Sequence, residues 1–402
     1  MNAIITPALP RGTAQAPASK SYAHRYLICA LLTGGGKVCG IELSDDIRAT
    51  LRCMSALGAQ YELKDDVLTV VSGIDKSIDR ATMNVGESGS TLRFFIPICL
   101  ALGGEFTFTG SERLFERPLS VYADLCAKRD ISFALGKGTL KICGRLEGGC
   151  AAVPGNISSQ FISGLLFAGT LTRSPLHVAV TGRAESVPYI EMTRSCLMRH
   201  GIFTEKRGDV YSVRRGIPRA IVTEVERDWS NAAYLLAFNY VGGAVRLTGL
   251  DENSLQGDKV CLKLFEMLVC GTPVISVADC PDLFPALCVV AALNNGAEFT
   301  RISRLRLKES DRAGVMARIL ERFGAGIELY SDSIIIKPCD ISLREGNAFD
   351  CSNDHRIVMA LALLMSVYGG TILNCSAVNK SFPDYFHIFR ALGGKATLYE
   401  DQ

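Results

Sequence analysis

The 402-residue sequence has no excess of either charge and no long apolar run. Lys and Arg number 43 and Asp and Glu 41, so the net charge is only +2. This balance excludes a strongly basic nucleic-acid-binding surface as the main role, and it also excludes an acidic tail. Hydrophobic residues make up 48% and charged residues 21% of the chain, a composition that excludes disorder and predicts a sizeable folded core.

Signals for metal binding, export and membrane insertion are also missing. The five histidines show no HExxH spacing and the fifteen cysteines include no CxxC pair, so no metal site is predicted. We interpret the cysteines as small buried residues of a reducing compartment. Residues 1–10 lack the features of a secretory signal, and the longest nearly unbroken apolar run, 357–368, is too short to span a bilayer. We therefore expect a soluble cytoplasmic protein without a membrane or nucleic-acid partner.

Glycine, with 38 residues, is frequent and regularly placed. An apolar helical pattern that ends in Gly, and once in Asp, recurs about every seventy residues, with one shorter interval before the fifth copy. Glycine at such an end is typical of a left-handed helix C-cap. The six markers are Gly58, Asp130, Gly201, Gly271, Gly324 and Gly393.

A second marker has the same period. A small polar cluster opens an apolar helix six times, beginning at Ser19, Ser88, Ser158, Ser230, Pro281 and Ser352. Two independent markers with one period predict six internal repeats. Each repeat is interpreted as strand–helix–strand–helix followed by a hairpin, with hairpin turns at residues 136–138 and 207–209.

Two irregularities predict how the repeats are grouped. The fourth repeat is shorter by about one hairpin, and the sixth ends after one strand, residues 395–399, whose missing partner could be the N-terminal segment 3–7. The repeats then form two domains of three repeats each. One domain is discontinuous, residues 1–12 plus 224–402, and the other covers 13–223. Because only two segments join them, we expect the domains to close on each other when substrate binds.

The helix openings carry a chemical signal. Ordinary N-capping explains their Ser, Asn and Asp residues. It does not explain the cations Lys20, Arg25, Arg93 and Arg356, because a cation in the first turn of a helix is unfavourable unless an anion is bound. Helix N-termini bind anions through their free backbone N–H groups. The openings therefore predict binding of anionic ligands.

Eight short motifs in order resemble the 5-enolpyruvylshikimate-3-phosphate synthase family over about residues 11 to 390. They are residues 18–25 (ASKSYAHR), 86–93 (GESGSTLR), 116–119 (ERPL), 158–161 (SSQF), 186–189 (SVPY), 307–312 (LKESDR), 353–356 (NDHR) and 380–385 (KSFPDY). The resemblance implies an α/β (α+β) fold of two inside-out α/β barrel domains, each with three βαβαββ repeats. This count agrees with the six repeats predicted above from the markers.

The resemblance also implies an activity. The family transfers the enolpyruvyl group of phosphoenolpyruvate to the 5-hydroxyl of shikimate 3-phosphate and releases phosphate, by addition and elimination through a tetrahedral intermediate. This is a step of the shikimate pathway to chorismate and the aromatic amino acids. By resemblance, Asp282 is the base toward the 5-hydroxyl, and Glu309 is the acid near the methylene carbon, with Lys20 and Lys380 sharing that proton transfer. No cofactor is expected, and the protein is expected to be a monomer.

The resemblance assigns the substrate contacts residue by residue. Contacts to shikimate 3-phosphate are expected from Lys20, Ser21, Arg25, Ser158, Ser159, Gln160, Ser186, Asp282 and Lys308. Contacts to phosphoenolpyruvate are expected from Lys20, Gly89, Arg117, Gln160, Arg312, Arg356 and Lys380. Arginine suits these anions because its guanidinium offers a two-pronged donor to a carboxylate or phosphate. Glycine at position 89 should leave room for glyphosate, so inhibition by glyphosate is expected.

Other interpretations remain open at this stage. Asp282 could be a helix N-cap, and Glu309 could form an ordinary salt bridge with Arg312 three residues on. Two positions depart from the family pattern: Glu87 and Arg304 stand where the family has Asn. A related transferase that acts on UDP-N-acetylglucosamine is disfavoured, because Glu112 occupies the position of its loop cysteine. A non-catalytic phosphate-binding scaffold is disfavoured because it would avoid carboxylates at its anion sites.

Overall fold

The computed structural model describes residues 1–214 and 217–400 and divides into two compact units. The continuous unit is Ala18–Glu226, and the split unit combines Met1–Pro17 with Arg227–Gln402. The sequence predicted crossings near residues 12 and 223, and the contacts place them at 17 and 226. Within the described residues, no helix has the length and apolar character needed to cross a membrane.

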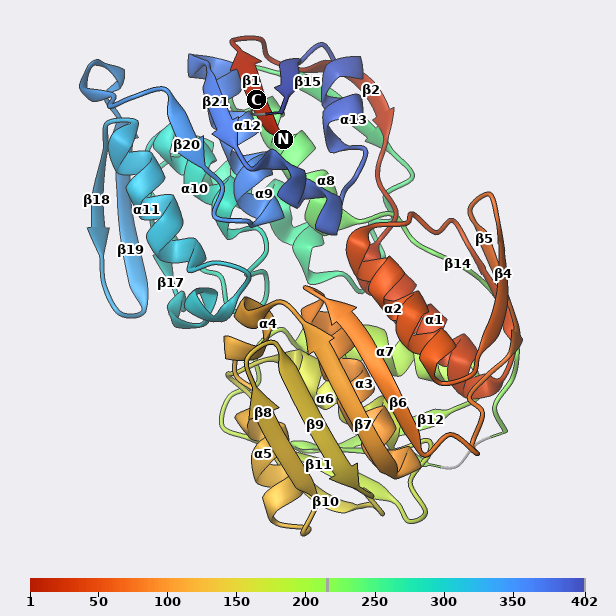
Figure 1. The fold of residues 1–402 in the computed structure, drawn as a ribbon. Coiled ribbons are helices and arrows are strands. Elements are labelled where there is room, and N and C mark those ends of the chain that lie inside the picture. Colours follow the sequence, from red (N-terminus) through yellow and green to blue (C-terminus); the bar gives the residue numbers. More distant parts are fainter. Residues whose placement is uncertain (215–216, 401–402) are drawn as a thin grey trace. The chain divides into compact units, whose positions relative to one another are not determined.

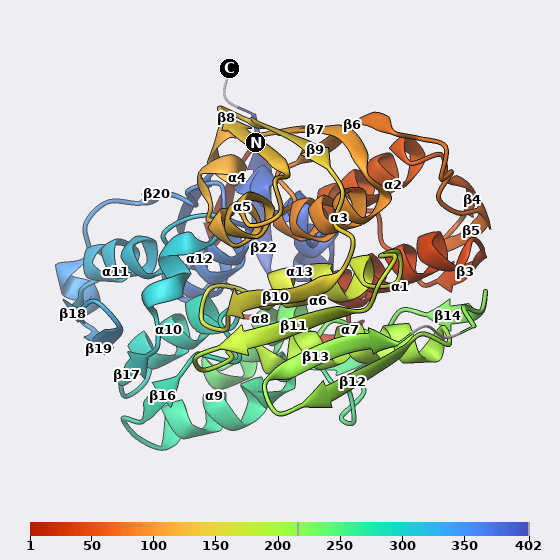
Figure 2. The ribbon, with the colours of Figure 1, turned by 90° about the horizontal axis from the view of Figure 1, so that it is seen from below.

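The described part of the continuous unit contains three four-stranded sheets with one shared topology. In each sheet the first two strands are parallel, and the last two form an antiparallel hairpin whose second strand pairs with the sheet. Figure 1 shows the second sheet and Figure 2 the third. In spatial order the sheets are β14 (Val222–Glu224), β3 (Gly36–Cys39), β5 (Val67–Ser72) and β4 (Gln60–Lys64); β6 (Arg80–Gly86), β7 (Gly104–Gly110), β9 (Thr139–Gly144) and β8 (Ser132–Gly136); and β10 (Gly149–Pro154), β11 (Leu176–Thr181), β13 (Val210–Arg214) and β12 (Phe203–Arg207).

One helix of each repeat in this unit is buried nearly all round. These are α1 (Lys20–Thr33), α3 (Gly89–Leu102) and α6 (Ser159–Ala168). A helix that is hydrophobic on every face belongs in the middle of a core, so the sheets lie outside and the helices inside. The remaining helices are α2 (Asp45–Ala56), α4 (Glu112–Glu116), α5 (Ser120–Ala127) and α7 (Val187–Arg199).

The split unit repeats the same topology with one omission. Its sheets are, in spatial order, β2 (Arg11–Gln15) and β15 (Ala244–Thr248); β16 (Val274–Ser276), β17 (Ala297–Thr300), β19 (Ser333–Cys339) and β18 (Ala325–Leu329); and β20 (Ala348–Asp350), β21 (Gly370–Leu373), β1 (Asn2–Thr6) and β22 (Lys395–Tyr399). The first sheet has two described strands, which confirms that the fourth repeat lacks a hairpin. Strand β1 pairs with β21 and β22, which confirms the N-terminal segment as the missing strand of the sixth repeat (Figure 1).

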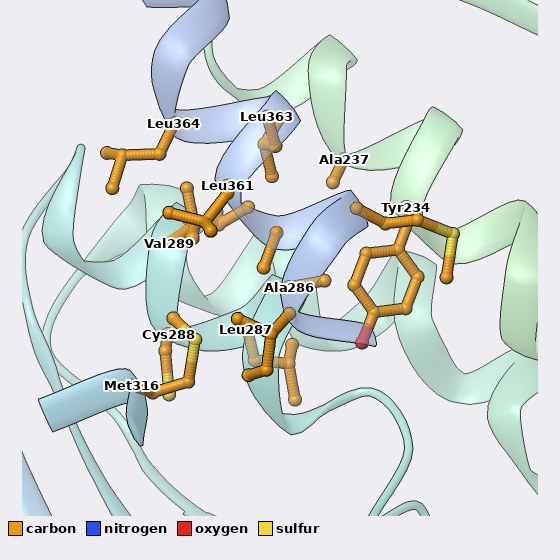
Figure 3. Close-up of a cluster of buried hydrophobic side chains, with 14 of the residues drawn as sticks. Tyr234, Ala237, Ala286, Leu287, Cys288, Val289, Met316, Leu361, Leu363 and Leu364 are labelled. Atoms are coloured by element: carbon orange, nitrogen blue, oxygen red, sulfur yellow. The ribbon is translucent and has the colours of Figure 1, made fainter. Parts of the chain in front are cut away.

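The core of the split unit is built from α8 (Trp229–Leu236), α10 (Phe284–Ala292) and α12 (His355–Tyr368), each buried nearly all round. Figure 3 shows Tyr234, Leu287 and Leu361 among the apolar side chains that these helices bring together. The other helices are η1 (Ala237–Tyr240), η2 (Gly257–Val260), α9 (Cys261–Cys270), η3 (Ser303–Leu307), α11 (Arg312–Arg322), η4 (Ile341–Leu343), η5 (Cys375–Lys380) and α13 (Tyr385–Ala391).

The helix-end markers hold with one exception. Asp130 has a φ of 54°, the left-handed conformation that the glycines adopt at four of the other marker positions, so it does fill a glycine position. Gly271 is wrong as a left-handed cap, because its φ is 175°. It follows α9 in the repeat that lacks a hairpin, so the chain leaves this helix in an extended conformation.

Two predicted helix openings are displaced in the structure. Helix α8 begins at Trp229, because Asp228 is its N-cap and accepts a hydrogen bond from the backbone N–H of Asn231. Helix α10 begins at Phe284, so Asp282 lies before it and does not cap it. The alternative interpretation of Asp282 as a helix N-cap is therefore wrong.

Strands β2 and β14 were missed by the sequence interpretation. In sequence, β2 precedes α1 and β14 precedes α8, but β2 pairs with β15 in the split unit and β14 pairs with β3 in the continuous unit. Both strands are short, five and three residues, and carry few large apolar side chains. Each strand thus completes a sheet of its own unit just before the chain passes into the other unit.

Candidate active site

The predicted site residues fall into two groups, one in each unit. The first group, called the continuous-unit half-site, lies at the N-termini of α1, α3 and α6 and in the loops beside them. Ser19, Ser88 and Ser158 are the N-caps of these helices, and each side chain accepts a backbone N–H of its first turn. The caps fix where each helix begins, so the residues that follow them are held in place.

Lys20 is the first residue of α1 and is paired with a buried acid. Its Nζ lies 2.7 Å from Oδ2 of Asp46, and the two side chains are 15% and 12% exposed. Asp46 lies in the first turn of α2, where the helix dipole favours a carboxylate. Asp46 was not among the predicted site residues, because its pairing with Lys20 is a contact that local sequence does not specify.

Gly89 lies beneath two guanidinium groups. A Cβ atom at this position would lie 2.8 Å from Nη1 of Arg117 and 2.9 Å from Nη1 of Arg93. The same Nη1 of Arg93 donates to Oε1 of Gln160 at 3.0 Å, and Nε2 of Gln160 donates to Oγ of Ser90. Cations, an amide and the first turn of α3 thus surround one small residue, which is an arrangement suited to a small anion.

Arg25 is buried and is oriented by neutral groups. Its Nε donates to Oγ1 of Thr193, and its two Nη atoms donate to the backbone oxygens of Ser21 and Tyr189. The guanidinium also lies over the rings of Phe94 and Tyr189, at 5.5 and 5.9 Å from their centroids. Burial lowers the pKa of Arg25. These contacts fix the orientation of the guanidinium without a carboxylate partner among the hydrogen bonds described.

The predicted serines lie in two settings. Ser158 caps α6, and Ser159 is the first residue of that helix and is buried. Ser186 precedes α7 with a φ of 55° and makes no side-chain cap bond. A positive φ is unusual for serine, and such strain is common at ligand sites.

The second group, called the split-unit half-site, surrounds Asp282. Oδ1 of Asp282 lies 2.6 Å from Nη1 of Arg312 and 3.3 Å from Nζ of Lys308, and its Oδ2 lies 3.8 Å from Nη2 of Arg356. The backbone oxygen of Asp282 accepts the hydroxyl of Tyr234 at 2.8 Å. Burial alone would raise the pKa of Asp282, but Lys308, Arg312 and Arg356 outweigh it and hold this pKa well below its usual range.

Arg312 joins three carboxylates. Besides Asp282 it contacts Oε2 of Glu309 at 2.7 Å, which is the i,i+3 salt bridge considered above, and Oδ2 of Asp354 at 2.8 Å. Asp354 is fully buried, caps α12 and also accepts a hydrogen bond from the hydroxyl of Ser310. Burial opposes the charge of Arg312, but Asp354, Glu309 and Asp282 raise its pKa well above the ordinary value.

Arg356 and Lys380 complete this half-site. Nη1 of Arg356 donates to the backbone oxygen of Ser230 and to Oδ1 of Asn231, and Nζ of Lys380 donates to the backbone oxygen of Asn353. Nε of Arg356 is buried and has no hydrogen-bond partner within the described part of the chain. A buried donor without a partner is costly unless a ligand satisfies it, which is consistent with an anion site here.

The two residues that depart from the family pattern differ in their setting. Glu87 is exposed, just before the N-cap of α3. Arg304 is buried and donates to the backbone oxygen of Ala278, four residues before Asp282. Arg304 therefore supports the loop that carries the predicted base.

A sequence model of EPSP synthase (3-phosphoshikimate 1-carboxyvinyltransferase) matches residues 8–389. The chain belongs to the EPSP synthase family. Relatives named 3-phosphoshikimate 1-carboxyvinyltransferase include those of Clostridium kluyveri, 34% identical over 416 residues with 97% of each protein covered, and Clostridioides difficile strain 630, 34% identical over 432 residues with 97% of each covered. A solved EPSP synthase structure from Acinetobacter baumannii has the same fold, with a TM-score of 0.78, 23% identity, and 99% of this chain and 100% of that chain covered.

Membership of the EPSP synthase family confirms the fold and the class of activity that the motifs indicated. The chain is an enzyme of the shikimate pathway, a carboxyvinyl transferase of aromatic amino-acid biosynthesis. The UDP-N-acetylglucosamine transferase and the non-catalytic scaffold are not favoured.

The prediction of site residues was incomplete for acids and neutral partners. Asp46, Asp354, Asn231 and Tyr234 contact predicted site residues but were not selected from the sequence. Asp354 had a signal, since it lies inside the NDHR motif next to Arg356. Asn231 also had a signal, since it belongs to the predicted helix opening that begins at Ser230, whereas Tyr234 lies further along the apolar helix and had none. With Asp46 and Asp354 included, the seven predicted site cations are accompanied by four acids rather than by Asp282 and Glu309 alone, so the local excess of positive charge is three rather than five.

Proposed function

We propose that the two half-sites act on the same pair of substrates, phosphoenolpyruvate and shikimate 3-phosphate. The observation that carries the proposal is the position of Asp282, a carboxylate surrounded by Lys308, Arg312 and Arg356. A protein that only bound anions would gain nothing from a carboxylate among its binding cations. A transferase that must remove a hydroxyl proton beside bound anions needs one.

The substrates carry two phosphates and two carboxylates, and the chain offers matching donors. Lys20, Gly89, Arg117, Gln160, Arg312, Arg356 and Lys380 bind phosphoenolpyruvate. Lys20, Ser21, Arg25, Ser158, Ser159, Gln160, Ser186 and Lys308 bind shikimate 3-phosphate. The buried Nε of Arg356 supports the first set, and the fixed orientation of Arg25 supports the second.

Asp282 is the base that accepts the proton of the 5-hydroxyl. Its low pKa means that it is ionised at neutral pH and able to accept a proton, although weakly. Bound phosphate and carboxylate groups partly neutralise the positive charges of Arg312 and Arg356. The attraction of these arginines for the ionised form of Asp282 then becomes weaker. Its pKa then rises, which makes the carboxylate a stronger base at the moment when the hydroxyl is in place.

Glu309 is the acid for the methylene carbon, with Lys20 and Lys380 sharing this transfer. In the addition step, the 5-oxygen bonds to the central carbon of phosphoenolpyruvate while the methylene carbon gains a proton and becomes a methyl group. In the elimination step, the methyl group returns a proton, the double bond re-forms and the bond to phosphate breaks. The pairing of Glu309 with Arg312 places the carboxyl beside the cation that binds the phosphoenolpyruvate. Because this pairing favours the ionised carboxylate, Glu309 can give a proton only once bound phosphoenolpyruvate competes for Arg312.

Release of inorganic phosphate from the two substrates tests the proposal. The unaltered protein should release phosphate only when both substrates are present. Asp282→Asn and Glu309→Gln should lower kcat by about 10²- to 10⁴-fold, the usual contribution of general acid–base groups. Asp279→Asn, an exposed acid three residues away, is the matched control and should retain full activity. Full activity of both site variants would refute the assigned roles.

The proposal includes a monomeric protein in the cytoplasm. All fifteen cysteines carry free thiols, and most are buried, as expected in a reducing compartment. Light scattering coupled to gel filtration should give the mass of one 43.4 kDa chain.

A further inference from the structure

A chain of hydrogen bonds through the core of the continuous unit joins three helices that carry half-site residues. Nδ1 of His24 on α1 lies 2.8 Å from Oγ1 of Thr50 on α2, which lies 2.8 Å from Oγ1 of Thr91 on α3. Oγ1 of Thr91 lies 2.7 Å from Oγ of Ser88, the N-cap of α3. All four side chains are at most 1% exposed, in a core that is otherwise largely apolar.

The donor and acceptor in each hydrogen bond from His24 through Thr50 to Thr91 can be assigned from the neutral state of the His24 ring. Burial, together with the charges of Lys20 and Arg25, holds the pKa of His24 well below its ordinary value, so the ring is neutral. Nε2 of His24 has no partner within the described residues. A buried lone pair costs less than a buried N–H, so the proton is placed on Nδ1. His24 then donates to Thr50, Thr50 donates to Thr91, and Thr91 donates to the backbone oxygen of Asp46.

Both ends of this chain of hydrogen bonds lie next to residues of the continuous-unit half-site. Asp46 holds Lys20 at 2.7 Å, and His24 lies one helical turn beyond Lys20. Ser88 caps the first turn of α3 and immediately precedes Gly89, the residue beneath Arg117 and Arg93. The hydroxyl of Thr50 is the link through which the start of α1 and the start of α3 are held at a fixed spacing.

Packing does not require a hydroxyl at position 50. Valine has the shape of threonine, so what Thr50 adds over valine is its hydroxyl and the hydrogen bonds that this hydroxyl makes. Threonine and histidine instead introduce polar groups that are costly in a dry environment unless they find partners, and within the described residues Nε2 of His24 is left without one. The chain of bonds ends at the N-cap of α3 and at Asp46, both adjacent to expected phosphoenolpyruvate ligands.

We propose that Thr50 is a positioning residue that fixes the start of α3 relative to Lys20 and thereby sets the affinity for phosphoenolpyruvate. This inference rests on the proposed function. Shikimate 3-phosphate should depend less on the start of α3, because Gly89, which follows Ser88, is an expected ligand of phosphoenolpyruvate alone. The shikimate 3-phosphate ligands Ser158, Ser159 and Ser186 lie on other elements, outside the chain of bonds.

The test compares Thr50→Val with Thr50→Ser in the full-length protein by steady-state phosphate release. Thr50→Val removes the hydroxyl and keeps the volume, so KM for phosphoenolpyruvate should rise about five- to tenfold, as for loss of a buried hydrogen-bond link. KM for shikimate 3-phosphate should stay within about twofold. Thr50→Ser retains the hydroxyl and should stay within about twofold of the unaltered protein for both constants.

A buried hydroxyl elsewhere in the unit provides the control. Thr223 on β14 is buried and donates to the backbone oxygen of Lys37, so Thr223→Val should lower the melting temperature without changing either KM. If Thr50→Val fails to fold, Thr91→Val removes the next hydroxyl and should give the same selective rise. An unchanged KM for phosphoenolpyruvate, or a parallel rise of both constants, would overturn the proposal. Absence of phosphate release by the unaltered protein would instead refute the proposed function.

Discussion

Two buried arginines, Arg25 in one half-site and Arg312 in the other, are held in different ways, although Lys20 of the continuous unit is also paired with a carboxylate. In the continuous unit, Arg25 is oriented by a hydroxyl and two backbone oxygens, and Arg93 by an amide. In the split unit, Arg312 is oriented by three carboxylates. Neutral partners leave the full positive charge for a ligand, whereas carboxylates neutralise it until a ligand competes. The first arrangement suits recognition of an anion, and the second suits a site where protons move between acids.

Arg312→Met should cause the largest loss of stability among the variants that test this difference between Arg25 and Arg312. It removes the partner of the fully buried Asp354 and leaves an uncompensated charge, so the free energy of unfolding should fall by about 3–5 kcal/mol. Arg25→Met leaves only neutral acceptors without a donor, and its cost should be about 1–3 kcal/mol. Urea unfolding followed by circular dichroism measures both values. Equal losses would show that the two half-sites are stabilised in the same way.

Gly89→Ala addresses the continuous-unit half-site. Because the added Cβ would lie within 3 Å of the guanidinium groups of Arg117 and Arg93, both must move, and KM for phosphoenolpyruvate should rise about tenfold. Inhibition by glyphosate, expected at millimolar concentration for the unaltered protein, should weaken as well. Gly271→Ala is the matched control, since a Cβ there meets no atom within 4 Å. If kinetics of the two variants agree, the close approach at Gly89 has no role in binding.

The sequence predicted the features that depend on local patterns and missed those that depend on contacts between distant residues. The repeats, the hairpin missing from the fourth repeat and the strand returned by the N-terminus were predictable, because period and helix ends are local patterns. Lys20 and Arg356 could be singled out as well, since a Lys or Arg in the first turn of a helix is unfavourable without an anion, whereas Arg117, Lys308, Arg312 and Lys380 came only from the family resemblance. Asp46 and Thr50 were not, because an acid or a threonine on a surface-like stretch of helix has no local sign of its long-range partner. Strands β2 and β14 were missed for a related reason: their partners lie far away in sequence.

Stability should depend on pH in two different ranges, one set by His24 in the continuous unit and one set by Asp282 in the split unit. His24 has a pKa well below 6.5, because burial and then Lys20 and Arg25 disfavour its charged form. Below about pH 6.5 the unfolded chain therefore binds a proton that the folded chain does not, and stability should fall by up to about 1.4 kcal/mol per pH unit. Asp282 has a lowered pKa, so its contribution should be complete above about pH 4 and be lost only as the pH falls further.

Urea unfolding between pH 3.5 and 7.5, at intervals of about half a pH unit, resolves these two windows. His24→Asn should flatten the slope between about pH 5 and 6.5 without removing it, because His200 in the same unit also has a pKa lowered by burial. Asp282→Asn should leave that slope intact and flatten the curve only at the acid end. A His24→Asn variant whose slope matches the unaltered protein would mean that His24 is protonated in the folded state. Its ring would then be a donor at both nitrogens, and the direction of the bonds from His24 through Thr50 to Thr91 could no longer be inferred from a neutral ring.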